Sequence, residues 1–417
     1  MAEAGRLPAA QAWLSAPATR AVMAALEAVG GPACARFVGG CVRNALIGQP
    51  IDDVDIATVL EPQTVIRALR AAGLKAVPTG VEHGTATAVA ERRAFEITTL
   101  RRDVETDGRR AVVAFTTDWG EDARRRDFRL NAVYADAAGL LYDPTGEGIA
   151  DALAGRVVFV GDAETRIRED ALRILRFFRF HAWYGRGEPD AAALAACAAL
   201  KDQVRGLSAE RVSKELLKLL AAEDPRPAVR LMLEAGVLAE LLPQAAGLGR
   251  FERLVAIETG QLFSLDPLLR LGALLPADPA AGEASARRLR LSNAQRERLT
   301  AMLGVEPPLT AAMSPRQARA AVYRLGRAAF CDRALLAWAA SDDTASDSRW
   351  RALPALAQAW PRPILPLTGD DALAAGAARG PQVGAALREV EAWWVENDFP
   401  DDRAVLLARL KAVAGKA

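Results

Sequence analysis

Apolar positions in the first 150 residues recur with two different periods, which indicates that strands and helices alternate there. Alternation typical of strands is found at Phe37–Val38, 53–57, Lys75–Val77, Thr85–Ala90 and Ala94–Thr99. Helical spacing is found at Cys41–Ile47 and over residues 61–73, where Pro62 stands in the first turn. The pattern therefore predicts a region of mixed strands and helices at the start of the chain.

After Asp151 the alternating pattern is limited to Val157–Val160, and helical spacing dominates the rest of the chain. Breaks that contain proline separate the expected helices, at Asp224–Pro225, Asp266–Pro267, Pro276–Ala281, Pro307–Pro308, Ser314–Pro315 and Pro361–Pro366. We therefore expect three parts, which cover residues 1–150, 151–225 and 226–417.

Composition adds a few limits. The chain has 417 residues, of which 51% are hydrophobic and 25% charged, as in ordinary globular proteins. The formal net charge is +1, so any surface for nucleic acid must be local. The four cysteines show no C-x-x-C spacing, which argues against a zinc site or a disulfide framework. Because no secretory signal and no long apolar run is seen, we expect a cytoplasmic protein with no membrane partner.

Two acidic residues in the second expected strand, Asp53 and Asp55, share one face because side chains alternate along a strand. Two carboxylates this close repel each other unless a cation lies between them, and such oxygen ligands suit a divalent metal in phosphate chemistry. Gly39 and Gly40 let backbone N–H groups approach a triphosphate, and Arg43 adds charge one helical turn later. The alternative is a solvated strand end that follows an ordinary turn.

The order strand, G-G-x-V-R, helix, turn, D-x-D over residues 37–58 resembles the nucleotidyltransferase superfamily. In detail it resembles the class II branch, the CCA-adding enzymes and bacterial poly(A) polymerases. That family usually has G-G-x-V-R-D, and Asn44 here replaces the last Asp, which keeps the shape but loses the charge. The resemblance implies an α+β nucleotidyltransferase domain of the polymerase beta type with a mixed or antiparallel sheet, followed by an all-α C-terminal region.

Two further stretches are similar to this family. Glu96 stands in the pattern E-x-T-x-x-R, and if its strand pairs beside Asp55 it becomes a third catalytic carboxylate. The arginine-rich residues 101–126 predict a mobile basic loop, with a solvated surface loop as the alternative. In the motif R-R-D-F-R-L-N-A, the resemblance implies that Arg126 reaches phosphate and that Asp127 accepts a hydrogen bond from a ribose hydroxyl.

Residues 162–181 are expected to form a helix on which Asp170 and Arg173, three apart, project together. An accepting carboxylate and a donating guanidinium can read cytosine or adenine, whereas uracil and guanine present the reverse pattern. An intrahelical salt bridge is the alternative, and similarity to the family motif E-D-x-x-R favours base reading. We expect Arg176 to face the nucleotide and Arg179 to lie at its margin.

The resemblance implies an enzyme that adds CCA to the 3′ end of tRNA from CTP and ATP, with Mg²⁺ held by Asp53 and Asp55. It also implies a catalytic head over residues 1–150, a base-recognition neck over 151–225, and an RNA-binding body and tail over 226–417. Candidates for phosphate contact in the last part are Arg287, Arg288, Arg290, Arg296, Arg298, Arg316, Arg319, Arg324 and Arg327.

Three alternatives remain open. A poly(A) polymerase is disfavoured, because that subgroup typically has a G-R-R-F-type stretch where this chain has T-G-V-E-H-G-T. Addition of CC alone or of A alone is compatible with the same motifs. An inactive RNA-binding relative would have no need for intact carboxylates at positions 53, 55 and 96 together with the pair at 170 and 173.

Overall fold

The computed structural model describes residues 3–8, 11–107, 110–260 and 263–415, and it describes their side chains except over 103–113. The chain divides into two compact units, Met1–Pro243 and Gln244–Ala417. The boundary expected near residue 150 falls inside the first unit, so the division into three parts stays a prediction.

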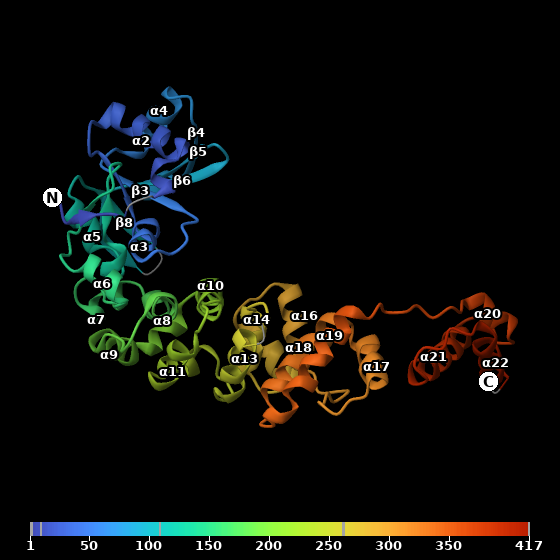
Figure 1. Ribbon diagram of the computed structural model, residues 1–417. Coiled ribbons are helices and arrows are strands. Elements are labelled where there is room, and N and C mark those ends of the chain that lie inside the picture. Colours follow the sequence, from blue (N-terminus) through green and yellow to red (C-terminus); the bar gives the residue numbers. More distant parts are fainter. Residues whose placement is uncertain (1–2, 9–10, 108–109, 261–262, 416–417) are drawn as a thin grey trace. The chain divides into compact units, whose positions relative to one another are not determined.

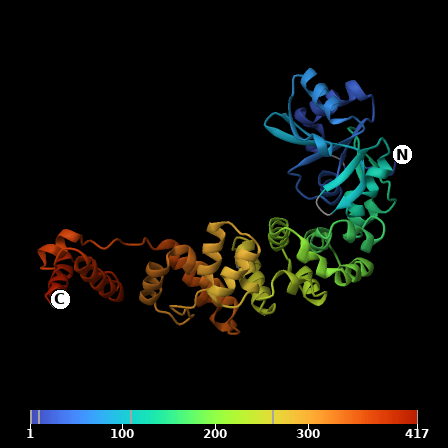
Figure 2. The ribbon, with the colours of Figure 1, turned by 180° about the vertical axis from the view of Figure 1, so that it is seen from behind.

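A sheet makes up the N-terminal part of the first unit, and Figure 1 labels its strands β3, β4, β5 and β6. In the described residues its strand order is β1-β10-β9-β2-β3-β6-β5-β4. Figure 2 shows the same blue-to-cyan region from behind. Strands β3 and β6 run parallel and every other neighbouring pair is antiparallel, so the expected mixed sheet is confirmed. The strands are β1 (Gly5–Arg6), β2 (Ala35–Val38), β3 (Val54–Thr58), β4 (Lys75–Gly80), β5 (Thr85–Ala90), β6 (Arg93–Thr99), β9 (Tyr134–Ala135) and β10 (Leu140–Tyr142).

Helices pack against this sheet through the apolar faces that the sequence predicts. Helices α2 and α4 contact each other and strand β5, and α3 contacts β2 and β3. In α4, Pro62 occupies the first turn, and Val65, Ile66 and Leu69 are buried. The helices and 3₁₀ turns of this region are α1 (Ala12–Ser15), α2 (Pro17–Gly30), α3 (Gly40–Ile47), α4 (Pro62–Ala71), η1 (Val81–His83), α5 (Trp119–Arg124), η2 (Arg129–Asn131) and α6 (Gly148–Ala154).

The stretch over 101–126 is not the loop that the sequence suggested. Strands β7 (Arg101–Asp107) and β8 (Arg110–Phe115) pair as an antiparallel hairpin, and helix α5 follows. The run A-V-V-A-F at the end of β8 favours a strand, and the arginines around it concealed this propensity. Arg109 and the side chain of Arg110 lie outside the described part of the chain.

Residues 162–181 also differ from the prediction, because they form two helices. Helix α7 (Ala163–Glu169) ends at Asp170, which has extended backbone angles (φ −155°, ψ 104°), and α8 (Leu172–Tyr184) begins just after it. An aromatic cluster joins α8 to the segment just before η2, since the Phe128 ring lies 4.9 Å from Phe159 and 5.0 Å from Phe180 of α8. The rest of this unit comprises α9 (Ala191–Ala199), η3 (Lys201–Gly206), α10 (Ala209–Leu220), α11 (Arg226–Glu234) and α12 (Val237–Leu241).

The second unit contains no strand among its described residues, as expected for an all-α region. Helix α21 (Pro381–Glu396) begins just after Gly380, and its buried Val390 and Trp394 pack with Leu406 and Leu410. No described helix of the chain has the length and hydropathy needed to cross a membrane. The helices are α13 (Gly249–Gly260), α14 (Pro267–Leu274), α15 (Pro279–Arg288), α16 (Asn293–Met302), α17 (Pro315–Leu325), α18 (Arg327–Ala339), η4 (Thr344–Ser346), α19 (Asp347–Ala359), α20 (Gly369–Ala374), α21 (Pro381–Glu396) and α22 (Arg403–Ala414).

Candidate active site

The glycine pair lies between strand β2 and helix α3. Gly39 has a φ of +73°, a left-handed conformation that residues with a side chain rarely adopt. A Cβ built on Gly39 would lie 3.9 Å from Oδ2 of Asp55 and 3.9 Å from Nη1 of Arg126. Helix α3 begins at Gly40, so the amides of its first turn are available to an anion at this point. The turn thus faces an acid and a cation together.

The three candidate acids lie on neighbouring strands. Asp53 directly precedes β3 and Asp55 lies within it, and the parallel register pairs Asp55 with Glu96 of β6. Asp55 is half-buried, and Asp53 and Glu96 are exposed. Phe95 and Ile97 are buried, so the predicted alternation along β6 is confirmed and Glu96 lies beside Asp55 as the pattern required.

The electrostatics at Asp55 fit a cation. Burial raises the pKa of Asp55 to about 6, with a further contribution from Glu96 that Arg126 partly offsets, and a smaller one from Asp53. Among the described residues no three acidic, histidine or cysteine side chains are grouped closely enough to hold an ion by themselves. One or two carboxylates that share a cation with substrate phosphates are, however, a common arrangement for Mg²⁺. The donor set therefore fits a metal that arrives with a nucleotide.

Asp122 of helix α5 is an acid that sequence reasoning missed. It is fully buried, its Oδ1 accepts a hydrogen bond from Arg125 Nε at 2.8 Å, and its Oδ2 accepts from Arg126 Nη2 at 3.0 Å and from the Tyr134 hydroxyl at 2.7 Å. Burial alone would raise the pKa of Asp122, but the charges of Arg126 and Arg125 outweigh it and hold the pKa at about 2. The spacing of three and four residues between this acid and the two arginines was the available signal.

Asp127 lies against helix α8. Its Oδ2 accepts from Arg176 Nε at 2.8 Å, and its Oδ1 accepts from Asn131 Nδ2 at 3.0 Å and from the Phe128 amide at 2.8 Å. Burial alone would raise the pKa of Asp127, but the charge of Arg176 and the hydrogen bonds lower it to about 2. The carboxylate is thus committed to protein partners in this state, and its contact with a ribose stays a prediction.

Asp170 and Arg173 flank the junction between α7 and α8, so they do not project from one helix as the spacing suggested. Asp170 Oδ1 accepts from the Leu172 amide at 3.1 Å, and Oδ2 accepts from Arg211 Nη2 at 2.7 Å. Arg173 Nη1 donates to Oε2 of Glu169 and to the backbone of α7. The intrahelical salt bridge between Asp170 and Arg173 is therefore absent among these described contacts. The backbones of the two residues are joined at the junction, where the Arg173 amide donates to the Asp170 carbonyl at 3.0 Å.

One face of α10 supports α8. Glu215 forms ion pairs with Arg179 and, at 3.7 Å, with Arg176 Nη1. The indole of Trp183 donates to the Lys218 carbonyl at 2.7 Å. The side chain of Arg179 thus links α8 to α10, and its place at the margin of the nucleotide site stays a prediction. This polar face was not predicted from the sequence.

Arg43 is buried, with only 6% of its surface exposed. Its Nη1 donates to Asn131 Oδ1 at 2.5 Å, its Nη2 donates to the Tyr184 hydroxyl at 2.7 Å, and both Nε and Nη2 donate to Asn44 Oδ1. The guanidinium carbon lies 3.9 Å from the centre of the Tyr184 ring. The side chain expected to meet phosphate is therefore held by protein groups.

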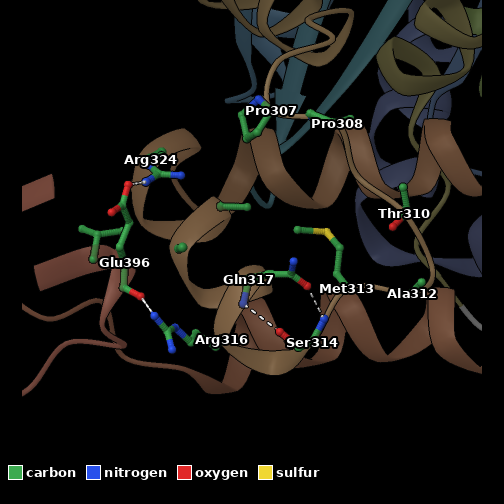
Figure 3. A pocket seen from close by; sticks show the side chains of 13 residues that line it. Pro307, Pro308, Thr310, Ala312, Met313, Ser314, Arg316, Gln317, Arg324 and Glu396 are labelled. Carbon is green, nitrogen blue, oxygen red and sulfur yellow. Dashed lines mark hydrogen bonds and ion pairs between the residues drawn. The ribbon is translucent and has the colours of Figure 1, made fainter. Parts of the chain in front are cut away.

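In the second unit, many of the arginines suggested for RNA contact have acidic partners: Arg298 pairs with Asp266 and Asp332, Arg319 with Asp398, and Arg287 and Arg296 with Glu283. A pocket of about 930 Å³ includes Arg316 and Arg324 in its lining (Figure 3). Arg316 donates to the Glu396 carbonyl, and Arg324 lies 3.9 Å from the Glu396 carboxylate. The charge at this pocket is thus partly balanced, and the phosphate contacts stay predictions.

Comparison with known proteins gives two matches to family models. The family model described as poly A polymerase head domain matches residues 35–158, and the one described as probable RNA and SrmB-binding site of polymerase A matches residues 188–248. The mitochondrial CCA tRNA nucleotidyltransferase 1 of Mus musculus is 32% identical over 391 residues, which cover 90% of this chain and 86% of the mouse protein. The CCA-adding enzyme of Latilactobacillus sakei is 30% identical over 395 residues, 94% of this chain and 96% of that protein.

A solved structure gives the same result. The crystal structure of the Bacillus stearothermophilus CCA-adding enzyme in complex with CTP matches with a TM-score of 0.73 and 25% identity, over 96% of this chain and 100% of that one. Sequence similarity and structural similarity to CCA-adding enzymes therefore both extend along nearly the whole length of the chain. This chain belongs to the family of CCA tRNA nucleotidyltransferases, the CCA-adding enzymes.

Proposed function

We propose that this protein adds C, C and A to the 3′ end of tRNA from CTP and ATP, with release of pyrophosphate. The observation that carries the proposal is the meeting of Asp55, Glu96 and the Gly39 turn at one point, in a chain whose full-length relatives are CCA-adding enzymes. The raised pKa of Asp55 supports a place for a divalent metal, and we propose that the metal is Mg²⁺.

The roles of the head residues follow from their chemistry. Asp53 and Asp55 would hold the metal, which when bound supplies Lewis-acid activation of the tRNA 3′-hydroxyl and neutralises charge on the α-phosphate. The amides after Gly39 and Gly40 bind triphosphate oxygens, and the Arg126 guanidinium adds a positive charge on the same side. Glu96 is the third catalytic carboxylate of this proposal, beside Asp55 on the next strand.

Base selection is proposed for the junction of α7 and α8. A carboxylate at Asp170 accepts from the amino group of cytosine or adenine, and the guanidinium of Arg173 donates to the neighbouring ring nitrogen. Uracil and guanine would leave these groups unpaired, which discriminates strongly. Before a base arrives, Arg211 pairs with Asp170 and Glu169 pairs with Arg173. When the nucleotide binds, Asp170 and Arg173 must leave these partners or bond to the partner and the base together.

For the remainder of the chain we propose the division into head (1–150), neck (151–225) and an RNA-binding body and tail (226–417). The match of residues 188–248 to a probable RNA-binding family model supports a tRNA partner for the helical region. The head and neck would then handle the nucleotide, and the later helices would hold the tRNA.

A polymerase that adds only adenosine is the second candidate, because the matching head model is described as that of poly A polymerase. The deciding experiment supplies a tRNA transcript that ends before CCA with each labelled NTP and then with mixtures. A CCA-adding enzyme incorporates two residues from CTP and one from ATP, and then stops. Long adenosine tails without any need for CTP would refute the proposal, and a stop after CC would restrict it.

For variants of the proposed metal ligands Asp53 and Asp55 in this assay, the matched control is Asp52→Asn. Asp52 directly precedes Asp53 and is exposed, and it lies outside the D-x-D pair. The Asp52→Asn variant should retain wild-type incorporation, which separates loss of a metal ligand from general loss of negative charge at this edge of the sheet.

A further inference from the structure

Arg43 belongs to a closed set of contacts that begins and ends on helix α8. Tyr184 accepts from Arg43, Arg43 donates to Asn131, Asn131 donates to Asp127, and Asp127 accepts from Arg176. Tyr184 and Arg176 both lie on α8, so the contacts form a ring through α3, the 3₁₀ turn η2 and the start of the R-D-F-R-L-N-A segment. We call these five residues the Arg43 ring.

The ring explains how a buried guanidinium is tolerated. Removing a charged group from water is costly unless its donors find acceptors. Nε and both terminal nitrogens of Arg43 donate to Asn44, Asn131 or Tyr184, and the aromatic faces of Tyr184 and Phe180 lie 3.9 and 5.3 Å from its central carbon. With its donors engaged in this way, Arg43 has little capacity left for a phosphate.

The residue after Arg43 makes this arrangement particular to the present chain. Asn44 is neutral, so Arg43 forms no ion pair there, and within the described residues it reaches a carboxylate only through Asn131, which bonds to Asp127. The charge of Arg43 is therefore balanced across the ring and not by its neighbour. Loss of any single link should be felt at the other links.

The two elements that the ring joins carry the two halves of the proposed nucleotide site. Helix α3 begins at the glycine pair, and α8 begins just after Asp170 and carries Arg173. Arg176 and Tyr184 are eight residues apart, about 12 Å along the helix axis. Tyr184 holds one end of α8 to α3 through Arg43, and Arg176 holds the other end to Asp127, which Asn131 links back to Arg43.

We propose that Arg43, Asn131 and Tyr184 are positioning residues for nucleotide selection: the ring that they close holds the base-reading junction at a fixed distance from the glycine turn. The inference rests on the proposed function, and it replaces the phosphate contact expected for Arg43. A nucleotide fits only if its base reaches Asp170 while its triphosphate reaches Gly39, so a loose α8 admits the wrong base and slows transfer with the right one.

The test removes one oxygen atom. The variant Tyr184→Phe keeps the aromatic group over Arg43 but loses the hydroxyl that accepts a hydrogen bond from Arg43. The matched control is Tyr142→Phe. The aromatic group of Tyr142 also lies over an arginine, since the guanidinium carbon of Arg36 is 3.8 Å from its centre. The Tyr142 hydroxyl donates to Asp136, which is not a member of the Arg43 ring. Steady-state kinetics with CTP and UTP are measured on tRNA lacking CCA, together with CTP binding to the full-length protein.

In Tyr184→Phe we expect kcat with CTP to fall and the preference for CTP over UTP to drop about tenfold, which corresponds to about 1.4 kcal/mol. CTP binding should change less than twofold. Asn131→Asp breaks the ring at another link, since it still accepts from Arg43 but no longer donates to Asp127, and it should give the same pattern. Tyr142→Phe should behave as wild type.

A direct phosphate contact by Arg43 would give a different result in these variants. If Arg43 binds phosphate directly, Arg43→Lys weakens CTP binding while Tyr184→Phe and Asn131→Asp select nucleotides like wild type, and the inference is overturned. If the wild-type protein itself fails to incorporate CTP and ATP, the proposed function fails, whatever the variants do. Melting curves for all variants identify unfolding, and a folded Tyr184→Phe with unchanged CTP preference also overturns the inference.

Discussion

Replacing Asp122 by Asn should destabilise the first unit strongly, because this buried carboxylate holds Arg125, Arg126 and Tyr134 together. Folding holds the pKa of Asp122 at about 2, compared with an ordinary value of 3.8. One pKa unit corresponds to about 1.4 kcal/mol, so the charged form is favoured by about 2.5 kcal/mol at neutral pH. Removing one partner of a buried ion pair costs about 3–5 kcal/mol.

We therefore expect Asp122→Asn to lose about 2–5 kcal/mol of unfolding free energy at pH 7, or about 4–20 °C in Tm. The comparison is urea unfolding of wild type, Asp122→Asn and the control Asp202→Asn, whose carboxylate pairs with Arg205 at the surface. If Asp122→Asn loses unfolding free energy within about 0.5 kcal/mol of the loss in Asp202→Asn, the stabilising role of the buried Asp122 carboxylate is refuted.

The pH dependence gives a second check on Asp122. Its folded pKa lies below its unfolded value, so the contribution is fully present above about pH 4 and disappears as the pH falls from 3.8 through about 2. The difference between wild type and Asp122→Asn should thus shrink steadily below pH 4. A difference that stays constant down to pH 3 would show that the carboxylate charge is not its source.

Three further outcomes follow from the proposed function. Asp53→Ala and Asp55→Ala should each abolish transfer, a loss of several kcal/mol in the barrier, while circular dichroism stays that of wild type; near-normal turnover would remove the metal assignment. Asp170→Ala and Arg173→Ala should raise UTP or GTP incorporation relative to CTP by ~10- to 100-fold, since a bidentate base contact is worth about 1–3 kcal/mol, and an unchanged ranking in kcat/KM would leave the junction as scaffold. A chain ended after Pro243, the last residue of the first compact unit, should bind CTP but lose tRNA affinity and its salt dependence; equal tRNA binding across a salt series would exclude the later helices as the RNA platform.

Local patterns predicted much of the catalytic region correctly. The alternation of Phe95, Glu96 and Ile97 placed one side chain in solvent and two in the core, and the parallel pairing of β3 with β6 is as the third-acid hypothesis required. The helix predicted over Cys41–Ile47 also agrees within a residue, since α3 begins at Gly40 and ends at Ile47. These features depend on residues close in the chain, for which burial on one face leaves a clear period.

Two predictions were wrong, and for different reasons. Residues 162–181 have continuous helical spacing, yet the chain turns at Asp170, where the Asp170 carboxylate bonds to the Leu172 amide and to Arg211 of α10. The hairpin over 101–115 was hidden by arginines that are common in loops. At Asp170 a partner outside the segment, Arg211, outweighs the local helical propensity. In the hairpin the strand propensity of residues 111–115 was present in the sequence, but the arginines around it concealed it.

The sequence by itself determined which acids, glycines and arginines are present, and for Asp55, Glu96 and the glycine pair it also determined the kind of element, because that follows from spacing along the chain. Only the tertiary structure decided what each charged group pairs with. Arg43 looked free for phosphate but is buried against Tyr184, which is 141 residues away, and Asp122 drew no attention but holds two arginines of the site. A buried charge must find a partner, and that partner is set by how distant elements pack, which no local period records.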